Sequence, residues 1–262
     1  MQLKLNSGFN IPSIGLGTWE NTGTPAKQAV LDALECGYRL IDTATIYKNE
    51  VEVGQGIKES GINREDIFVT TKIWNDQHND VSSALNKSLD SLMLDYIDLY
   101  LIHWPPAQGV RAETWKTMQK LSLEGKIRSI GVSNYSVSQL EQLIGETGII
   151  PAVNQVPISP FSVQTRFFHI SHNVGLIEYC NNKGIIVEAY SPLTRGVELN
   201  NLSLLTLAEK YNKTPAQILL RWGIQRGLVV IPKSQNKERI RENFNIFDFV
   251  LFTEDMKTLN TI

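Results

Sequence analysis

Short runs of β-branched and other apolar residues alternate along the chain with longer stretches whose apolar residues recur at helical spacing. This alternation is typical of βαβ units, in which helices join parallel strands. Two helical stretches carry end signals, because Thr24 and Asp80 are expected to cap them and Gly37 is expected to end the first. Eight runs are predicted to be strands, at residues 14–18, 39–41, 67–71, 96–102, 127–132, 152–154, 185–189 and 228–231.

The number of these units favours a closed barrel. Eight βα units within 262 residues, with no linker rich in Pro or Gly, are more typical of a (β/α)8 TIM barrel than of an open doubly wound sheet. Length alone would also allow two small domains. We predict an α/β fold with a single barrel domain over residues 1–262. The turn-forming residues 6–8 lie between apolar residues 3–5 and 9–11, which predicts an N-terminal β-hairpin that closes the barrel floor.

Composition argues against several kinds of partner. The 25 Lys and Arg residues and 27 Asp and Glu residues give a net charge of -2, so no global field favours nucleic acid or an anionic membrane. The sequence has no signal-peptide core and no apolar run of about 18 residues. Its two cysteines are too few for a disulfide framework. We expect a cytoplasmic monomer with a small-molecule substrate.

Polar residues stand at the ends of most predicted strands. In a TIM barrel the catalytic groups project from the C-terminal strand ends, around one mouth. Each residue alone has an ordinary explanation, because an Asp after a strand often caps a helix and a lone His is often structural. Their occurrence together indicates a functional site. The residues are Asp42, Lys72, His103, Ser133, Asn134, Gln155, Tyr190 and Lys233.

Tyr47 follows Asp42 closely enough to lean over the same mouth, where its phenol can donate a proton. A free phenol has a pKa of about 10, and a nearby ammonium such as that of Lys72 is expected to lower it. Asp42 can hold Lys72 through a salt bridge, and His103 can hydrogen-bond the oxygen of a bound carbonyl. This set of groups suits the protonation of an alkoxide as it forms.

Three stretches of the chain resemble the signatures of the aldo-keto reductases, in particular short-loop microbial members. They are residues 37–50 (GYRLIDTATIYKNE), 101–105 (LIHWP) and 231–234 (IPKS), within a likeness that runs from about residue 3 to about residue 252. The resemblance implies an NADP-dependent oxidoreductase that reduces aldehydes and ketones to alcohols by hydride transfer. It also implies a catalytic tetrad, with Tyr47 as general acid. The matching residues are Asp42, Tyr47, Lys72 and His103.

The resemblance also implies how NADPH is bound. The usual dinucleotide fingerprint is missing, because residues 15–17 (GLG) and 54–56 (GQG) both lack its third glycine. Ser133, Asn134 and Gln155 match positions that bind the nicotinamide carboxamide, and Tyr190 matches an aromatic residue that stacks on the nicotinamide ring. Positions that resemble the grip on the adenosine 2′-phosphate are Lys233, Ser234, Asn236, Arg239 and Asn243. By composition alone these would be a solvated basic helix end, whereas the likeness favours NADPH over NADH.

Trp19, Trp74 and Trp104 resemble the apolar walls of the family's substrate pocket, which implies a carbonyl compound with a hydrophobic body. We expect a broad substrate range, because the connection after His103 is short and the chain ends at Ile262, which leaves the mouth less covered. Residues 156–175 form a longer segment than the family pattern suggests, and its role is open.

Two other functions stay open at this point. One is a regulatory protein that binds NADPH and senses redox state, in the manner of the potassium-channel β subunits of the same superfamily. The other is a metal-dependent barrel lyase or isomerase. His169 and His172 form an H-x-x-H pattern, but no carboxylate or cysteine nearby completes a ligand set, so we expect no metal.

Overall fold

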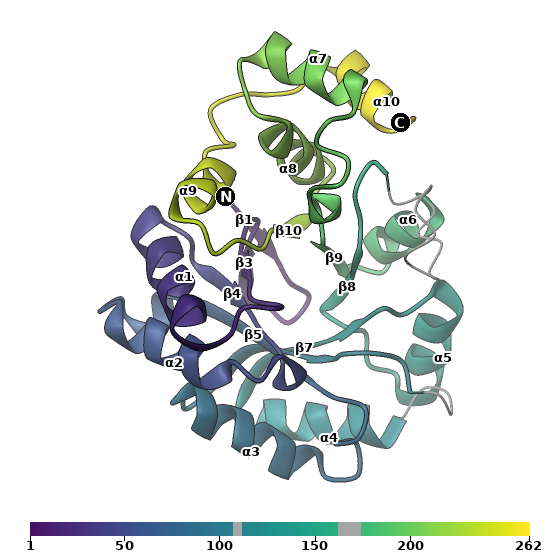
Figure 1. The fold of residues 1–262 in the computed structure, drawn as a ribbon. Helices are drawn as coiled ribbons and strands as arrows, with labels where there is room; N and C mark the ends of the chain where they lie inside the picture. The colour runs from purple at the N-terminus through teal and green to yellow at the C-terminus, as the bar shows by residue number, and fades with distance from the viewer. Residues whose placement is uncertain (107–111, 162–173) are drawn as a thin grey trace.

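Eight parallel strands close into a barrel, which confirms the predicted (β/α)8 fold (Figure 1). The computed structural model describes residues 1–106, 112–161 and 174–262. Isolated parallel bridges from Ile14 to Val230 and from Gly17 to Lys233 join the first strand of the ring to the last. The strands are β3 (Leu16–Gly17), β4 (Leu40–Asp42), β5 (Phe68–Ile73), β6 (Ile97–Ile102), β7 (Ile127–Ser133), β8 (Val153–Pro157), β9 (Ile186–Tyr190) and β10 (Val229–Ile231).

Helices surround the barrel (Figure 1). Within the described ranges, none is long and apolar enough to cross a membrane. The helices are α1 (Gly23–Cys36), α2 (Glu50–Glu59), α3 (Val81–Leu92), α4 (Ala112–Leu123), α5 (Val137–Thr147), α6 (Val174–Asn182), α7 (Leu202–Tyr211), α8 (Pro215–Gln225), α9 (Lys237–Phe244) and α10 (Thr253–Leu259). Three 3₁₀ turns are η1 (Thr45–Tyr47), η2 (Arg64–Asp66) and η3 (Thr194–Gly196).

The predicted helix ends are mostly correct. Asp80 caps α3, because its side chain accepts a hydrogen bond from the Ser83 backbone N–H. Gly37 ends α1 in the left-handed conformation, with φ 112°. The prediction that Thr24 caps α1 is wrong, since Thr22 is the N-cap. The backbone N–H groups of the first helical turn have no partner within the helix, so a proline, which lacks this group, fits at any position of that turn. Pro25 is therefore compatible with a helix capped by Thr22 and with one capped by Thr24.

Several strands extend beyond their predicted ends. The run 152–154 is part of β8, which continues to Pro157, and the run 185–189 is part of β9, which continues to Tyr190. Parallel pairing between Pro157 and Tyr190 holds both ends in the ladder. Side chains near these ends therefore project from rigid strands into the barrel mouth.

Two apolar clusters hold the fold together. One lies between the strands and the surrounding helices, and the other fills the lower part of the barrel interior. The interior cluster consists of Leu5, Ile11, Leu40, Phe68, Leu99, Leu101, Ala152, Val153, Val229 and Ile231. Because successive side chains on a strand point to opposite faces, the polar residues two positions further along several strands continue the same interior surface.

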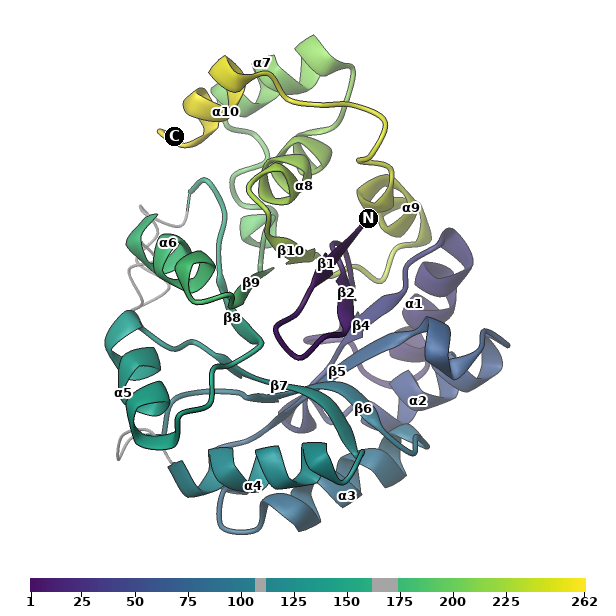
Figure 2. The same cartoon turned by 180° about the vertical axis from the view of Figure 1, so that it is seen from behind.

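The N-terminal hairpin closes the floor of the barrel, as predicted (Figure 2). Its strands are β1 (Gln2–Lys4) and β2 (Asn10–Pro12), paired antiparallel. The hairpin turn reaches the barrel strands through Asn6, which donates to the Pro151 carbonyl at 2.9 Å, and Ser7, whose hydroxyl lies 2.7 Å from that of Ser129. Gly8 adopts φ 94°, a conformation that glycine tolerates without strain.

Gly54 allows α2 to pack closely against the end of α3, and a larger residue is expected to destabilise the fold. A Cβ atom there would lie 2.3 Å from the Leu92 carbonyl oxygen, a backbone atom. We expect Gly54→Ala to lower the free energy of unfolding by about 1–3 kcal/mol through overpacking. Gly145→Ala is the matched control, since it lies in α5 with nothing within 4 Å of the added carbon. It should raise stability by about 0.5–1 kcal/mol in urea unfolding. Equal stability of the two variants would contradict this account.

Candidate active site

A cavity of about 1190 Å³ lies at the C-terminal ends of the strands. All but one of the predicted site residues line it, and the exception, Lys72, is fully buried against Asp42. Those in the wall are Trp19, Asp42, Tyr47, Trp74, His103, Trp104, Ser133, Asn134, Gln155, Tyr190, Lys233, Ser234, Asn236, Arg239 and Asn243. The barrel thus brings together residues that are far apart in the sequence.

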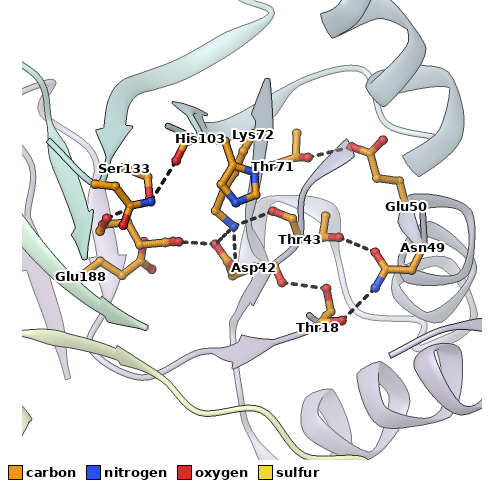
Figure 3. Close-up of polar contacts among 12 residues, drawn as sticks. Thr18, Asp42, Thr43, Asn49, Glu50, Thr71, Lys72, His103, Ser133 and Glu188 are labelled. Atoms are coloured by element: carbon orange, nitrogen blue, oxygen red, sulfur yellow. Dashed lines mark hydrogen bonds and ion pairs between the residues drawn. The ribbon is translucent and has the colours of Figure 1, made fainter. Parts of the chain in front are cut away.

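Asp42 and Lys72 form the predicted ion pair, from the adjacent strands β4 and β5 (Figure 3). The Lys72 Nζ donates to the two carboxylate oxygens of Asp42 at 2.7 and 2.8 Å and to the Thr43 carbonyl at 2.8 Å. Burial alone would lower the pKa of Lys72, but the charge of Asp42, aided by Tyr47 and Glu188, raises it. The lysine therefore remains a cation at neutral pH.

Tyr47 ends the η1 turn that follows β4, and this turn holds it beside the lysine. The Tyr47 N–H donates to the Ala44 carbonyl at 3.0 Å, which forms the turn. The Thr45 hydroxyl donates to the Lys72 carbonyl at 2.9 Å, which fixes the turn to β5. The Lys72 ammonium consequently lies 5.1 Å from the centre of the Tyr47 ring.

The loop on the other side of Tyr47 is anchored by Asn49, which is fully buried. Asn49 accepts a hydrogen bond from the Thr43 hydroxyl at 2.7 Å (Figure 3). Its amide donates to the backbone carbonyls of Thr18 and Asn21 at 2.9 and 2.7 Å. Tyr47 thus lies between two fixed points, and its ring has little freedom to leave the mouth.

The expectation that Lys72 lowers the pKa of Tyr47 is wrong for the net effect. Burial raises the pKa of the Tyr47 phenol above its ordinary value, and the Lys72 charge opposes this rise without cancelling it. Desolvation disfavours the phenolate, and the extent of burial cannot be read from the sequence. Tyr47 therefore carries its proton throughout the neutral range, as an acid must before it acts.

His103 follows β6 and lies against the edges of two aromatic rings. Its ring centre is 5.6 Å from that of Tyr47 and 5.0 Å from that of Trp74, both in edge-on geometry. Burial, with a contribution from the Lys72 charge, lowers the pKa of His103 to about 2. His103 is therefore a neutral imidazole, which can donate or accept a hydrogen bond but carries no charge.

Hydrogen bonds link the polar side chains of β7, β8 and β9 across the mouth. The Asn134 amide donates to the His103 carbonyl and to the Ser133 hydroxyl, both at 3.0 Å. Its side-chain oxygen accepts from the Tyr190 hydroxyl at 2.9 Å. The Ser133 hydroxyl donates to the backbone carbonyl of Gln155 at 2.8 Å. Asn134 has φ 66°, a left-handed conformation that asparagine tolerates better than most residues.

Sequence reasoning missed Glu188, which lies in the middle of β9 and is fully buried. The Gln155 amide donates to Glu188 and to Asp42, each at 2.8 Å. The available signal was a carboxylate inside the apolar run 185–189, since charged residues are seldom fully buried without partners. Glu188 lies within a strand, whereas the predicted polar site residues stand at the ends of strands or beyond them.

Lys233 and Arg239 line the same cavity, Lys233 just beyond β10 and Arg239 on α9. Both are exposed, and neither has an ion-pair partner among the described residues. Asn236 caps α9 by accepting from the Arg239 backbone N–H at 2.9 Å, so its amide NH₂ is the part that remains to donate. The Ser234 hydroxyl accepts from the Asn236 N–H at 3.1 Å. This part of the site offers cations and amide donors suited to an anion.

The three predicted tryptophans also line the cavity. Trp19 and Trp104 are each 37% exposed, and the Arg195 guanidinium stacks 4.5 Å from the centre of the Trp19 ring. Arg195 also lines the cavity and was not predicted. His169, His172 and most of the segment 156–175 lie outside the described residues.

The comparison with known families decides the assignment. Residues 13–262 match the model of the aldo/keto reductase family. The chain belongs to the aldo/keto reductase family. It is 46% identical over 263 residues to a glyoxal reductase of Bacillus subtilis, covering 99% of this chain and 92% of that one. It is 45% identical over 257 residues to the methylglyoxal reductase DkgA of Escherichia coli K12, covering 97% and 90%.

Solved structures agree with the family assignment. A Bombyx mori aldo-keto reductase crystallised in complex with NADP superposes with a TM-score of 0.89 at 41% identity, covering 99% of this chain and 92% of that one. The expectation of an NADP-dependent oxidoreductase of this family is thereby confirmed. The role of each residue is a separate question.

The neutral state of His103 can be tested by NMR. We expect its imidazole resonances not to titrate between pH 5 and 8, because its pKa is lowered to about 2. The chain has four histidines, so the spectrum of His103→Asn would assign the signal by its absence. A free histidine derivative in the same buffer, with an ordinary imidazole pKa of about 6.5, serves as the external reference. A midpoint for His103 between pH 5 and 7 would contradict the structure.

Proposed function

We propose that this aldo/keto reductase reduces small aldehydes and ketones, 2-oxoaldehydes among them, to alcohols with NADPH, and that Tyr47 is the general acid. The observation that carries the proposal is the Tyr47 phenol held beside the buried Lys72 cation, with the neutral His103 on the same cavity wall. The presence of the Tyr47 phenol together with the Lys72 cation favours an enzyme that turns over substrate. It argues against a purely regulatory protein that binds NADPH and senses redox state.

The cavity residues fit the proposed cofactor. The amide and hydroxyl groups of Ser133, Asn134 and Gln155 suit a carboxamide, and Tyr190 offers an aromatic face beside them. The cations of Lys233 and Arg239, which have no ion-pair partner in the described part of the chain, line the same cavity and suit a phosphate. When bound, NADPH supplies the hydride.

In the proposed mechanism the chain's own residues manage one proton. The carbonyl oxygen lies within reach of the Tyr47 hydroxyl and the His103 imidazole, and both donate hydrogen bonds to it. As negative charge develops on this oxygen, Tyr47 transfers its proton. The Lys72 ammonium stabilises the phenolate that remains, and Asp42 keeps the ammonium in place. His103 orients the carbonyl without changing its own charge.

The tryptophans in the cavity wall bear on which carbonyl compounds are accepted as substrates. Trp19, Trp74 and Trp104 offer apolar contact. Their contribution to discrimination between substrates is modest, since one methylene more or less in such a pocket changes the free energy of transition-state binding by only about 1–3 kcal/mol. Two relatives named glyoxal reductase and methylglyoxal reductase support small dicarbonyl aldehydes as substrates. The cytoplasmic location and the monomeric state stay predictions.

The loss of the Tyr47 proton donor tests the reaction. We expect Tyr47→Phe to reduce kcat for methylglyoxal and benzaldehyde by about 10² to 10⁴, the usual contribution of general acid catalysis. The dissociation constant for NADPH should change little, because the ring is kept. Tyr100→Phe is the matched control, since this buried hydroxyl has no partner among the described residues and lies outside the cavity. NADPH absorbance follows both variants, and near-normal turnover by Tyr47→Phe would reject the assignment.

The two cations of the cavity wall, Lys233 and Arg239, test the cofactor preference. We expect Arg239→Ala and Lys233→Ala each to weaken NADPH binding by about ten- to a hundredfold, the value of a charged hydrogen bond, while NADH binding changes little. Arg241→Ala is the control, because Arg241 is on the same helix but outside this cavity. Titration of protein fluorescence with each cofactor gives the dissociation constants. Equal losses for NADPH and NADH would place the phosphate elsewhere.

A further inference from the structure

Glu188 is a carboxylic acid in the barrel interior that has no part in the mechanism above. Its side chain points inward from β9, where its backbone partners in the ladder are Gln155 of β8 and Val229 of β10. It is fully buried and does not line the cavity. A buried carboxyl costs free energy unless it is paired or neutral, so its presence calls for a role.

The contacts of Glu188 link it to the site through one residue. The Gln155 Nε2 donates to Glu188 Oε2 at 2.8 Å and to Asp42 Oδ2 at 2.8 Å. Both amide hydrogens of Gln155 are thereby used by carboxyl oxygens. The reversed amide would place its oxygen against the Asp42 carboxylate, which Lys72 keeps ionised, so the orientation is fixed even when Glu188 is neutral. The Gln155 carbonyl oxygen is then the group left for the cavity that Gln155 lines.

The charges around Glu188 favour its neutral form. The titratable groups that act on it are Asp42 from β4 and Lys72 from β5, and Tyr47 on η1 is close enough to feel its charge. Two carboxyls therefore share one ammonium in the barrel interior. Burial, and then the charge of Asp42, raise the pKa of Glu188 to about 8.

We propose that Glu188 is a positioning residue of the reductase, which locks the Gln155 amide so that its carbonyl oxygen accepts a hydrogen bond from the nicotinamide carboxamide. This inference rests on the proposed function. As a neutral acid Glu188 leaves Asp42 as the counter-ion of Lys72. When Glu188 ionises, a second negative charge acts on Lys72 and Tyr47, and it disfavours the phenolate that the reaction forms.

Two near-isosteric variants separate the hydrogen bond from the charge. Glu188→Gln keeps an acceptor oxygen for Gln155 but cannot ionise, whereas Glu188→Leu removes both. We expect Glu188→Leu to weaken the binding of NADPH and of NADH by the same factor, about two- to tenfold, because one hydrogen bond is lost. The factor is the same because both cofactors carry the nicotinamide. Glu188→Gln should bind both cofactors as the wild type does.

The pH profile supplies a readout that a purely structural role would not change. We expect the wild-type kcat for methylglyoxal to fall as pH rises through about 8, where Glu188 ionises. In Glu188→Gln this fall should be absent, with kcat at pH 7 unchanged within about twofold, since the variant mimics the neutral acid.

Either of two results would overturn the proposal: wild-type affinity of Glu188→Leu for both cofactors, or persistence of the fall near pH 8 in Glu188→Gln. If Glu188→Leu does not fold, the profile of Glu188→Gln decides alone. A wild-type protein that binds NADPH but turns over no carbonyl compound would reject the proposed function. The cofactor affinities of the two variants would still test Glu188.

Discussion

The rest of the site depends on the buried ion pair between Asp42 and Lys72. Removing two charges from water costs several kcal/mol per ion, and a buried pair seldom repays this as stability. Here the cost is offset by complete hydrogen bonding, since the Thr43 carbonyl and the Gln155 amide supply the remaining partners. Adjacent parallel strands place the two residues within reach, so the barrel itself sets the geometry. A charge kept at this depth is better explained by its action on Tyr47 than by stability.

The motif around Tyr47 serves two physical purposes. Asp42 and Tyr47 are the residues to which we assign the proposed chemistry. Thr43, Thr45 and Asn49 hold the loop against β3 and β5 through the bonds drawn in Figure 3 and the Thr45 contact. Asn49 and Thr45 join this loop to segments from two other strands. The anchoring residues, Asp42 and Tyr47 therefore lie in one continuous stretch, which is one of the three signatures recognised in the sequence.

The barrel could be predicted because its strands are apolar runs and its helices carry periodic stripes, both of which are local patterns. The strand ends were less predictable: β8 extends to Pro157 because β9 pairs with it, and pairing is not local. Asp42, Lys72 and His103 could be predicted to lie together because they stand at the ends of strands, and Tyr47 because it follows Asp42 closely. Glu188 was missed because it lies within a strand, and the pKa of Tyr47 was misjudged because burial depends on the whole fold.

The interior of the barrel is divided into an apolar lower part and a polar upper part. This division explains why a single buried lysine can act strongly on Tyr47. Phe68, Leu99 and Leu101, with the hairpin residues Leu5 and Ile11, seal the floor below the ion pair. This floor shields the ion pair from solvent, and Asp42 and Lys72 are 2% and 0% exposed. Coulomb interactions are stronger where solvent screening is low, so Lys72 acts on Tyr47 more strongly than a surface lysine would. The hairpin, remote from the chemistry, thus contributes to it by keeping one end of the barrel dry.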